Sequence, residues 1–283
     1  MDSSLANLAV VVCHGSYHTP APYEAFLQAI RARGIEAYCP QRPSSDLSKL
    51  NVGDVNNPDF DRGPPEGGYP TEADDAEVIV ELLKKLIDEE GKWVLLVGHS
   101  SGGWVATEAA KPELQATTRK AEGKQGGVVG IFYMGAFIIP VGESVHSFFQ
   151  PKDRPVVAPP FMRFHKHGLD GLGTVTDARQ YFFNDLDEES AKKWAATLTA
   201  GAVMPVRLTN NAYATVPCAY LVLEKDQTLS PEYQEGMVAL QNQKGTPPFT
   251  MYYAPSGHAP YLSWTEGLVG KLEEFARKVL PSQ

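Results

Sequence analysis

Near the middle of the chain, a serine stands between two glycines at the end of an apolar segment. Residues 93–97 read Trp-Val-Leu-Leu-Val, residues 98–102 read Gly-His-Ser-Ser-Gly, and a helix-favouring stretch follows. A strand that turns sharply into a helix needs small residues around the turn, and it leaves the side chain at its tip exposed. The N–H groups of the following helix then face any negative charge that develops there. We interpret Ser100 as a nucleophile, although the same letters also occur in ordinary strand–helix turns.

A serine nucleophile needs a base, and the base needs an acid that orients it. Segment 218–223 runs into Glu224-Lys-Asp226, and segment 249–253 runs into a loop that contains His258. The carboxyl ends of parallel strands share one edge of a sheet, so these side chains can meet there. The order serine, aspartate, histidine is the one expected for a nucleophile on a strand–turn–helix. We predict that Asp226 is the acid and His258 the base; Glu224 is the rival acid, and a plain turn aspartate is the alternative.

The first apolar segment, residues 8–13, ends in a glycine turn that reads His-Gly-Ser-Tyr-His at 14–18. Acyl transfer passes through a tetrahedral intermediate whose oxyanion needs two N–H donors. We nominate the backbone N–H groups of Ser16 and Ser101, since Ser101 lacks the glycine spacing of a nucleophile. A plain turn without a binding role is the alternative. The hydroxyl of Ser16 or the ring of His18 could also bind a substrate oxygen.

The composition is typical of a soluble globular protein. The chain has 283 residues, 43% of them hydrophobic, and a formal net charge of −9. This charge argues against binding to nucleic acids or anionic membranes. The apolar run that ends at Cys13 is too short to span a membrane and lacks the flanks of a signal peptide, so we expect a cytoplasmic protein. The three cysteines are far apart and show no metal-ligand spacing, so we expect neither a disulfide nor a metal.

Strand-like and helix-like segments alternate along most of the chain, which is typical of a mostly parallel sheet with helices on both faces. Strand character occurs in six segments, at 8–13, 35–38, 93–97, 128–137, 216–223 and 249–253. Helical character occurs at 22–32, 71–90, 101–114, 231–242 and 264–280. The polar stretch 40–69 is predicted to be a surface loop near a functional edge. The alternation stops at 141–215, so we predict a core of residues 1–140 and 216–283 with residues 141–215 inserted as a lid.

With these segments in place, the chain resembles the α/β-hydrolase superfamily. The matching motifs, in the expected order, are HGSYHTP at 14–20, GHSSG at 98–102, EKD at 224–226 and SGH at 256–258. The resemblance implies an α/β fold with a mostly parallel eight-stranded sheet and a lid inserted after the sixth strand. It also implies a Ser-His-Asp mechanism that needs no cofactor.

Within the superfamily, the chain looks similar to the group of plant-type esterases and hydroxynitrile lyases and their fungal serine-hydrolase relatives. Two features carry this narrower resemblance: the spacing of the histidines at 14–18, and Asp-Gln followed by Pro-Glu-Tyr-Gln within 226–234. The lyases of this group place a lysine directly after the catalytic histidine. Here that position is Ala259, so ester hydrolysis is favoured over cyanohydrin cleavage.

The predicted lid is rich in aromatic residues, and ligand sites are mostly apolar with a few polar groups. We therefore expect a small to medium apolar or aromatic ester or lactone as the substrate. The candidate substrate-binding residues are Tyr17, His18, Phe148, Phe182 and Tyr261. Two other functions stay open: lyase, isomerase or cyclase chemistry of specialised metabolism on the same fold, and a ligand receptor that retains the triad. A homodimer also stays open.

Overall fold

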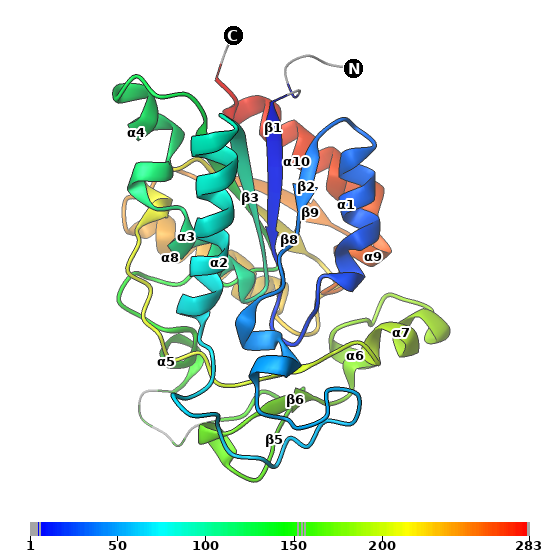
Figure 1. Ribbon diagram of the computed structural model, residues 1–283. Helices are drawn as coiled ribbons and strands as arrows, with labels where there is room; N and C mark the ends of the chain where they lie inside the picture. Colours follow the sequence, from blue (N-terminus) through cyan, green and yellow to red (C-terminus); the bar gives the residue numbers. More distant parts are fainter. Residues whose placement is uncertain (1–4, 6, 152, 154, 156, 282–283) are drawn as a thin grey trace.

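The computed structural model describes residues 5, 7–151, 153, 155 and 157–281. Its centre is a six-stranded sheet in which neighbouring strands are parallel (Figure 1). In spatial order the strands are β2 (Glu36–Tyr38), β1 (Leu8–Cys13), β3 (Trp93–His99), β4 (Gly127–Met134), β8 (Cys218–Leu223) and β9 (Thr250–Ala254). The expected number of eight strands is wrong for the described residues. The six segments with strand character all join the sheet, and no other described segment extends either edge.

Helices cover both faces of the sheet, as the alternation predicted. One face packs against α1 (Glu24–Arg31) and α10 (Thr265–Val279). The opposite face packs against α2 (Glu72–Lys84), α3 (Gly102–Ala109) and α8 (Pro231–Gln243). Shorter helical elements are a π-helical turn at Lys85–Glu89, α4 (Ala116–Ala121), α9 (Pro260–Ser263), and the 3-10 turns Ala21–Tyr23, Pro43–Ser45, Leu47–Lys49, Pro112–Leu114, Gly168–Asp170 and Ala212–Ala214.

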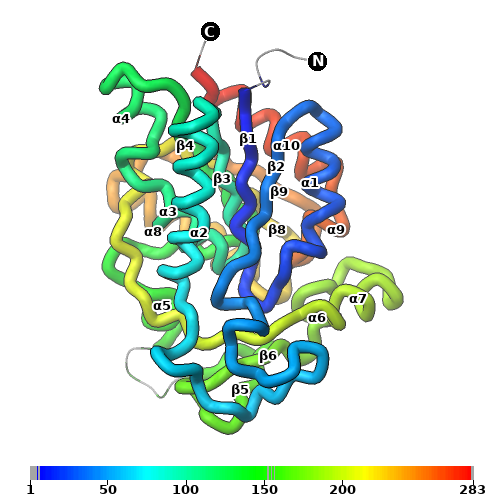
Figure 2. Tube along the Cα trace, viewed as in Figure 1, coloured from blue at the N-terminus to red at the C-terminus, as the bar shows by residue number. Residues whose placement is uncertain are grey.

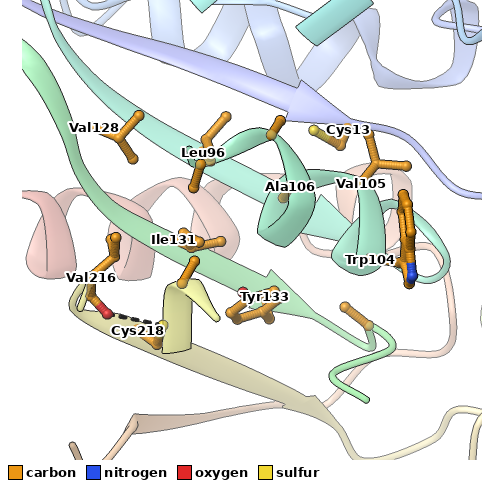
Figure 3. Close-up of a cluster of buried hydrophobic side chains, with 14 of the residues drawn as sticks. Cys13, Leu96, Trp104, Val105, Ala106, Val128, Ile131, Tyr133, Val216 and Cys218 are labelled. Carbon is orange, nitrogen blue, oxygen red and sulfur yellow. Dashed lines mark hydrogen bonds between the residues drawn. The ribbon is translucent and has the colours of Figure 1, made fainter. Parts of the chain in front are cut away.

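The two layers of helices bury most of the sheet. Every residue of β1, β4 and β8 is buried. Figure 3 shows one of the two cores, where Leu96 of β3 and Ile131 of β4 face Val105 and Ala106 of α3. Continuous apolar strands are expected when both faces of a parallel sheet are covered. The sheet therefore forms a rigid platform whose carboxyl ends share one edge.

The chain leaves the sheet after β4 and returns to it at β8. Between them lies the inserted segment, residues 141–215. Figure 1 shows most of it at the end of the molecule opposite the two termini, and its last residues run back beside α3 toward the start of β8. Thus the insertion follows the fourth strand of the main sheet, not the sixth. Its elements are α5 (Val145–Phe149), β5 (Met162–Phe164), β6 (Gly173–Val175), α6 (Ala178–Tyr181), α7 (Glu188–Ala195) and β7 (Ala200–Gly201). β5, β6 and β7 form a second, antiparallel sheet that the sequence patterns did not indicate.

The polar stretch 40–69 crosses the same end of the molecule and runs beside β5 and β6 (Figure 2). Leu50 and Val52 of this loop pack with Leu172 and Ala200 of the inserted segment. The backbone N–H of Lys166 also donates a hydrogen bond to Oδ1 of Asp61, at 3.0 Å. The loop and the inserted segment therefore form one joint layer over the carboxyl edge of the sheet.

Two further expectations concern membranes and cysteines. In the described part of the chain, no helix combines the length and the apolar character that crossing a membrane requires. Cys13, Cys39 and Cys218 are free thiols. Burial raises the pKa of the Cys13 thiol to about 12, so this group behaves as a small apolar side chain.

Candidate active site

Ser100 stands at the turn between β3 and α3 in a backbone conformation that is rare outside glycine. Its φ is 52°, in the left-handed region. Two glycines make the turn possible by close approach. A Cβ on Gly98 would lie 2.8 Å from the Cα of Gly103, and a Cβ on Gly102 would collide with the carbonyl oxygen of Cys13. A strained turn between glycines that carries a serine at its tip is the arrangement of a nucleophile elbow.

The tip of this turn faces a cavity of about 360 Å³, which is within the usual range for small-molecule sites. Ser16, Tyr17 and Ser100 line it from the sheet edge. Most of the remaining lining comes from the inserted segment and is apolar, with Val145, Phe149, Pro160, Phe161, Met162, Phe164, Leu169, Phe182, Val203 and Met204 among it. Phe137, Leu229 and Tyr233 contribute from the core.

Asp226 and His258 meet beside this cavity. Nδ1 of His258 donates to Oδ2 of Asp226 at 2.7 Å, and both side chains are buried. Asp226 follows β8, and its Oδ1 accepts the backbone N–H groups of Thr228 and Leu229 at 2.8 and 3.0 Å. These bonds fix the carboxylate, and the carboxylate in turn fixes the imidazole with a proton on Nδ1 and Nε2 facing away. Glu224, the rival acid, is exposed.

Ser100 lies close to the His258 loop but makes no hydrogen bond to His258. The preceding residue, His99, has its ring centroid 4.7 Å from that of His258. Within the described structure, the buried Nε2 of His258 has no hydrogen-bond partner. Phe182, which lines the cavity beside Ser100, lies edge-on to His258 with ring centroids 5.4 Å apart. Catalytic hydrogen bonds in ligand-free enzymes are often long and tighten only when substrate binds.

The two candidate oxyanion donors lie side by side. Among the described residues, none accepts a hydrogen bond from the backbone N–H of Ser16 or Ser101. The hydroxyl of Ser16 donates to Oγ of Ser101 at 2.7 Å, so the two turns are held together. The N–H groups are therefore free to bind an oxygen, and α3 begins at the next residue, Gly102.

Behind the donors lies a buried ion pair that sequence reasoning missed. Arg42 donates to the Asp75 carboxylate at 2.7 Å, and both side chains are at most 1% exposed. Another guanidinium nitrogen of Arg42 donates to Oγ of Ser101 at 2.9 Å and to the carbonyl oxygen of His14 at 2.6 Å. In the sequence, Arg42 is a charged residue in a polar loop. Such a residue normally has a solvated side chain, so the pattern gave no reason to predict a buried ion pair.

Three further histidines are buried around the same turns, and each is neutral. Burial, with the Arg42 charge second, holds the pKa of His14 well below its usual range. Burial also lowers the pKa of His18 to about 4, and burial holds the pKa of His99 well below its usual range. Of these four buried imidazoles, His258 alone is bonded to a carboxylate. Among the four, His258 therefore has the carboxylate partner that orients a general base.

Comparison with known proteins places the fold. The model of the family described as "Alpha/beta hydrolase family" matches residues 10–270. The chain belongs to the alpha/beta hydrolase family. It is 28% identical over 275 residues to an alpha/beta hydrolase of Aspergillus novofumigatus, covering 96% of this chain and 98% of that one.

Two solved structures share this alpha/beta hydrolase fold. One is a pyrethroid hydrolase from Sphingobium faniae, with a TM-score of 0.68 and 20% identity over 96% of this chain and 97% of that one. The other is a methylesterase from Arabidopsis, with a TM-score of 0.61 and 17% identity over 96% of this chain and 99% of that one. The family resemblance that the motifs indicated is confirmed by the family model that matches residues 10–270.

The predicted substrate-binding residues of this alpha/beta hydrolase fall into two groups. Tyr17 and Phe182 line the cavity. His18 and Tyr261 do not, because they are buried behind the turn, where Nε2 of His18 accepts the Tyr261 hydroxyl at 3.0 Å. Phe148 also lies outside the lining; it packs edge-on against Phe149, which takes its place there. In the part of the chain described here, no cluster of His, Cys, Asp and Glu could hold a metal ion.

Proposed function

We propose that this protein is a serine hydrolase that cleaves a carboxylic ester or lactone through an acyl-enzyme. One observation carries the proposal. The strained serine at the tip of the β3–α3 turn opens into an apolar cavity, and a buried imidazole bonded to a carboxylate lies beside it. The names of the pyrethroid hydrolase and methylesterase that share the fold support the same class of reaction.

In the proposed reaction, Nε2 of His258 takes the proton of Ser100 while the serine oxygen bonds to the substrate carbonyl carbon. The oxyanion accepts hydrogen bonds from the N–H groups of Ser16 and Ser101. Asp226 stabilises the imidazolium that forms. The intermediate collapses, the carbon–oxygen bond to the leaving alcohol breaks, and His258 returns its proton to that alcohol. Water then repeats the two steps on the acyl-enzyme, and the freed acid leaves.

The cavity supports a small to medium apolar or aromatic substrate. Its lining holds many aromatic and aliphatic side chains, and a volume of about 360 Å³ suits a molecule of that size. Most of the lining belongs to the inserted segment, so we propose that residues 141–215 serve as a lid. No step of the proposed reaction needs a metal or a cofactor.

The test combines activity with labelling. Wild-type protein is assayed against a panel of nitrophenyl esters and aromatic lactones beside Ser100→Ala and His258→Ala, and a fluorophosphonate probe is mapped by peptide mass spectrometry. We expect the label on Ser100, and we expect each variant to lose activity by about 10³-fold or more. Turnover of another substrate class without labelling would replace the proposal with lyase or isomerase chemistry. Saturable ligand binding without turnover would replace it with a receptor.

A further inference from the structure

A chain of hydrogen bonds runs behind the candidate catalytic groups, through two side chains that the proposed reaction does not use. The backbone N–H of Gly15 donates to the hydroxyl oxygen of Tyr23 at 3.1 Å. The Tyr23 hydroxyl is 2.6 Å from Nδ1 of His99, and Nε2 of His99 is 2.8 Å from the carbonyl oxygen of His258. The side chains of Tyr23 and His99 are fully buried.

The position of each proton in this chain follows by elimination. The carbonyl oxygen of His258 can only accept, so Nε2 of His99 carries a hydrogen. In a neutral imidazole the other nitrogen is then an acceptor, so Tyr23 donates its hydroxyl proton to Nδ1 of His99. Burial first, and the nearby His258 second, keep the pKa of His99 well below its usual range. The ring therefore stays neutral, and all the bonds point in one direction.

The chain joins three segments that are far apart in the sequence. Gly15 immediately precedes Ser16 in the turn with the first oxyanion donor, and His99 immediately precedes Ser100 at the nucleophile turn. His258 belongs to the loop after β9. Its side chain is fixed by Asp226, but its main chain is fixed by His99. A buried path thus connects the oxyanion turn, the nucleophile turn and the base loop.

We propose that His99 and Tyr23 are positioning residues that hold the base loop and the oxyanion turn in place relative to Ser100. The inference rests on the proposed function, because it concerns the rate of that reaction. A packing role alone would require the two rings but would not require a donor at Nε2 of His99 or a hydroxyl on Tyr23. Polar substitutions that keep one bond and remove the other therefore separate the two roles.

The decisive pair of variants is His99→Gln and His99→Asn. The amide nitrogen of glutamine can occupy the place of Nε2 and keep the bond to His258, whereas the amide oxygen of asparagine occupies the place of Nδ1 and keeps only the bond to Tyr23. We expect His99→Asn to lower kcat by about 100-fold, since small displacements of reacting groups have effects of that size. We expect His99→Gln to lose less than about tenfold in kcat, and KM to change by less than about threefold in both variants.

Tyr23→Phe tests the other end of the chain. It removes the acceptor of the Gly15 N–H and the donor to His99 while keeping the ring. We expect kcat to fall by about tenfold or more, with a smaller change in KM. The proposal would be overturned if His99→Gln and His99→Asn lost kcat equally. It would also be overturned if the loss of kcat in the three variants were explained by their lowered thermal midpoints alone.

A spectroscopic measurement tests the same chain without activity. In wild-type protein labelled with ¹⁵N-histidine, we expect His99 to show the neutral tautomer with hydrogen on Nε2 from about pH 8 to about pH 5. Protonation of His99 near the usual pKa of histidine, or hydrogen on Nδ1, would overturn the proposal even if a variant failed to fold. Full ester hydrolysis by Ser100→Ala would instead overturn the proposed function and leave the tautomer result standing.

Discussion

The carboxylate of Asp226 has more partners than orienting one imidazole requires. Its two oxygens accept hydrogen bonds from His258, from the backbone N–H groups of Thr228 and Leu229, and from the side-chain amide of Gln234. All four donors lie on the loop after β8, on α8 or on the base itself, so the carboxylate is held from several sides. The same bonds hold it in position, so the loop after β8 presents a fixed acceptor to His258.

Asp226→Asn should therefore act on the rate and not on the fold. The asparagine side chain is close in size, but its amide nitrogen would face Nδ1 of His258 and favour the wrong tautomer. We expect kcat for ester hydrolysis to fall by about 10²–10⁴-fold, as measured by steady-state kinetics at neutral pH. The matched control is Glu224→Gln, two residues earlier and exposed, which should retain activity. If Glu224→Gln lost activity while Asp226→Asn kept full activity, the role of the acid would belong to Glu224.

At the scale of single residues, chain order and strand ends were enough to nominate Ser100, Asp226 and His258. Parallel strands that end at one edge bring the three segments together. The buried neighbours Arg42 and Tyr23 could not be nominated. Each is joined to the site by a contact across many residues, and their local sequences resemble an ordinary polar loop and an ordinary helix start.

Among the elements, the first turn of α2 carries an unusual carboxylate. Glu72 is 1% exposed; its Oε1 accepts the backbone N–H of Val206 at 2.7 Å, while its Oε2 has no hydrogen-bond partner among the described residues. Burial raises the pKa of Glu72 to about 7, although Arg42 acts in the opposite direction. This carboxyl joins α2 to the end of the inserted segment. Its ionisation therefore affects the stability of the contact between the two.

The raised pKa fixes the sign of a pH effect on stability. Between about pH 4.5 and about pH 7 the folded protein holds a proton on Glu72 that the unfolded chain has released, so the free energy of unfolding falls as pH rises through this window. Glu72→Gln should remove this dependence. We expect the variant to match wild type near pH 4 and to be more stable above pH 7, by at most about 3 kcal/mol.

The measurement for Glu72 is denaturant unfolding at several pH values. The matched control is Glu77→Gln, on the exposed side of the same helix, which should change stability equally at all pH values. A constant difference between Glu72→Gln and wild type from pH 4 to pH 8 would mean that the Glu72 carboxyl has the same pKa in the folded and the unfolded chain, which would contradict the prediction.

The sequence predicted the long elements better than the short ones. The continuous apolar strands and the amphipathic helices were found because burial on one or both faces leaves a periodic pattern. α4 falls between the predicted helix 101–114 and the predicted strand 128–137, where no element was predicted because its residues Ala116–Ala121 are mostly polar. β5, β6 and β7 have two or three residues each, which is too short for any period to appear.

At the scale of the whole molecule, the described residues form three apolar cores. Two lie on opposite faces of the main sheet, and the third is a small cluster between the loop 40–69 and the inserted segment. The sequence indicated the first two because sheet and helices share a regular pattern. It could not indicate the third, since that cluster joins two irregular segments. The third core holds together the layer over the carboxyl edge that the loop 40–69 and the inserted segment form, which we call the roof of the cavity. The roof therefore depends on the core that the sequence pattern indicates least.

Because the third core is separate, its loss should open the roof without unfolding the sheet. Leu50 is 1% exposed within this cluster, and Leu50→Ala should lower the local unfolding free energy of the loop and of β6 by about 2–4 kcal/mol. Hydrogen exchange should show faster exchange in both, unchanged protection in β1 and β3, and a raised KM for apolar esters. The matched control is Val55→Ala, in the same loop and 45% exposed, which should leave exchange unchanged. If β1 and β3 lost protection to the same extent as the loop, the three cores would unfold as one unit and the roof could not open separately.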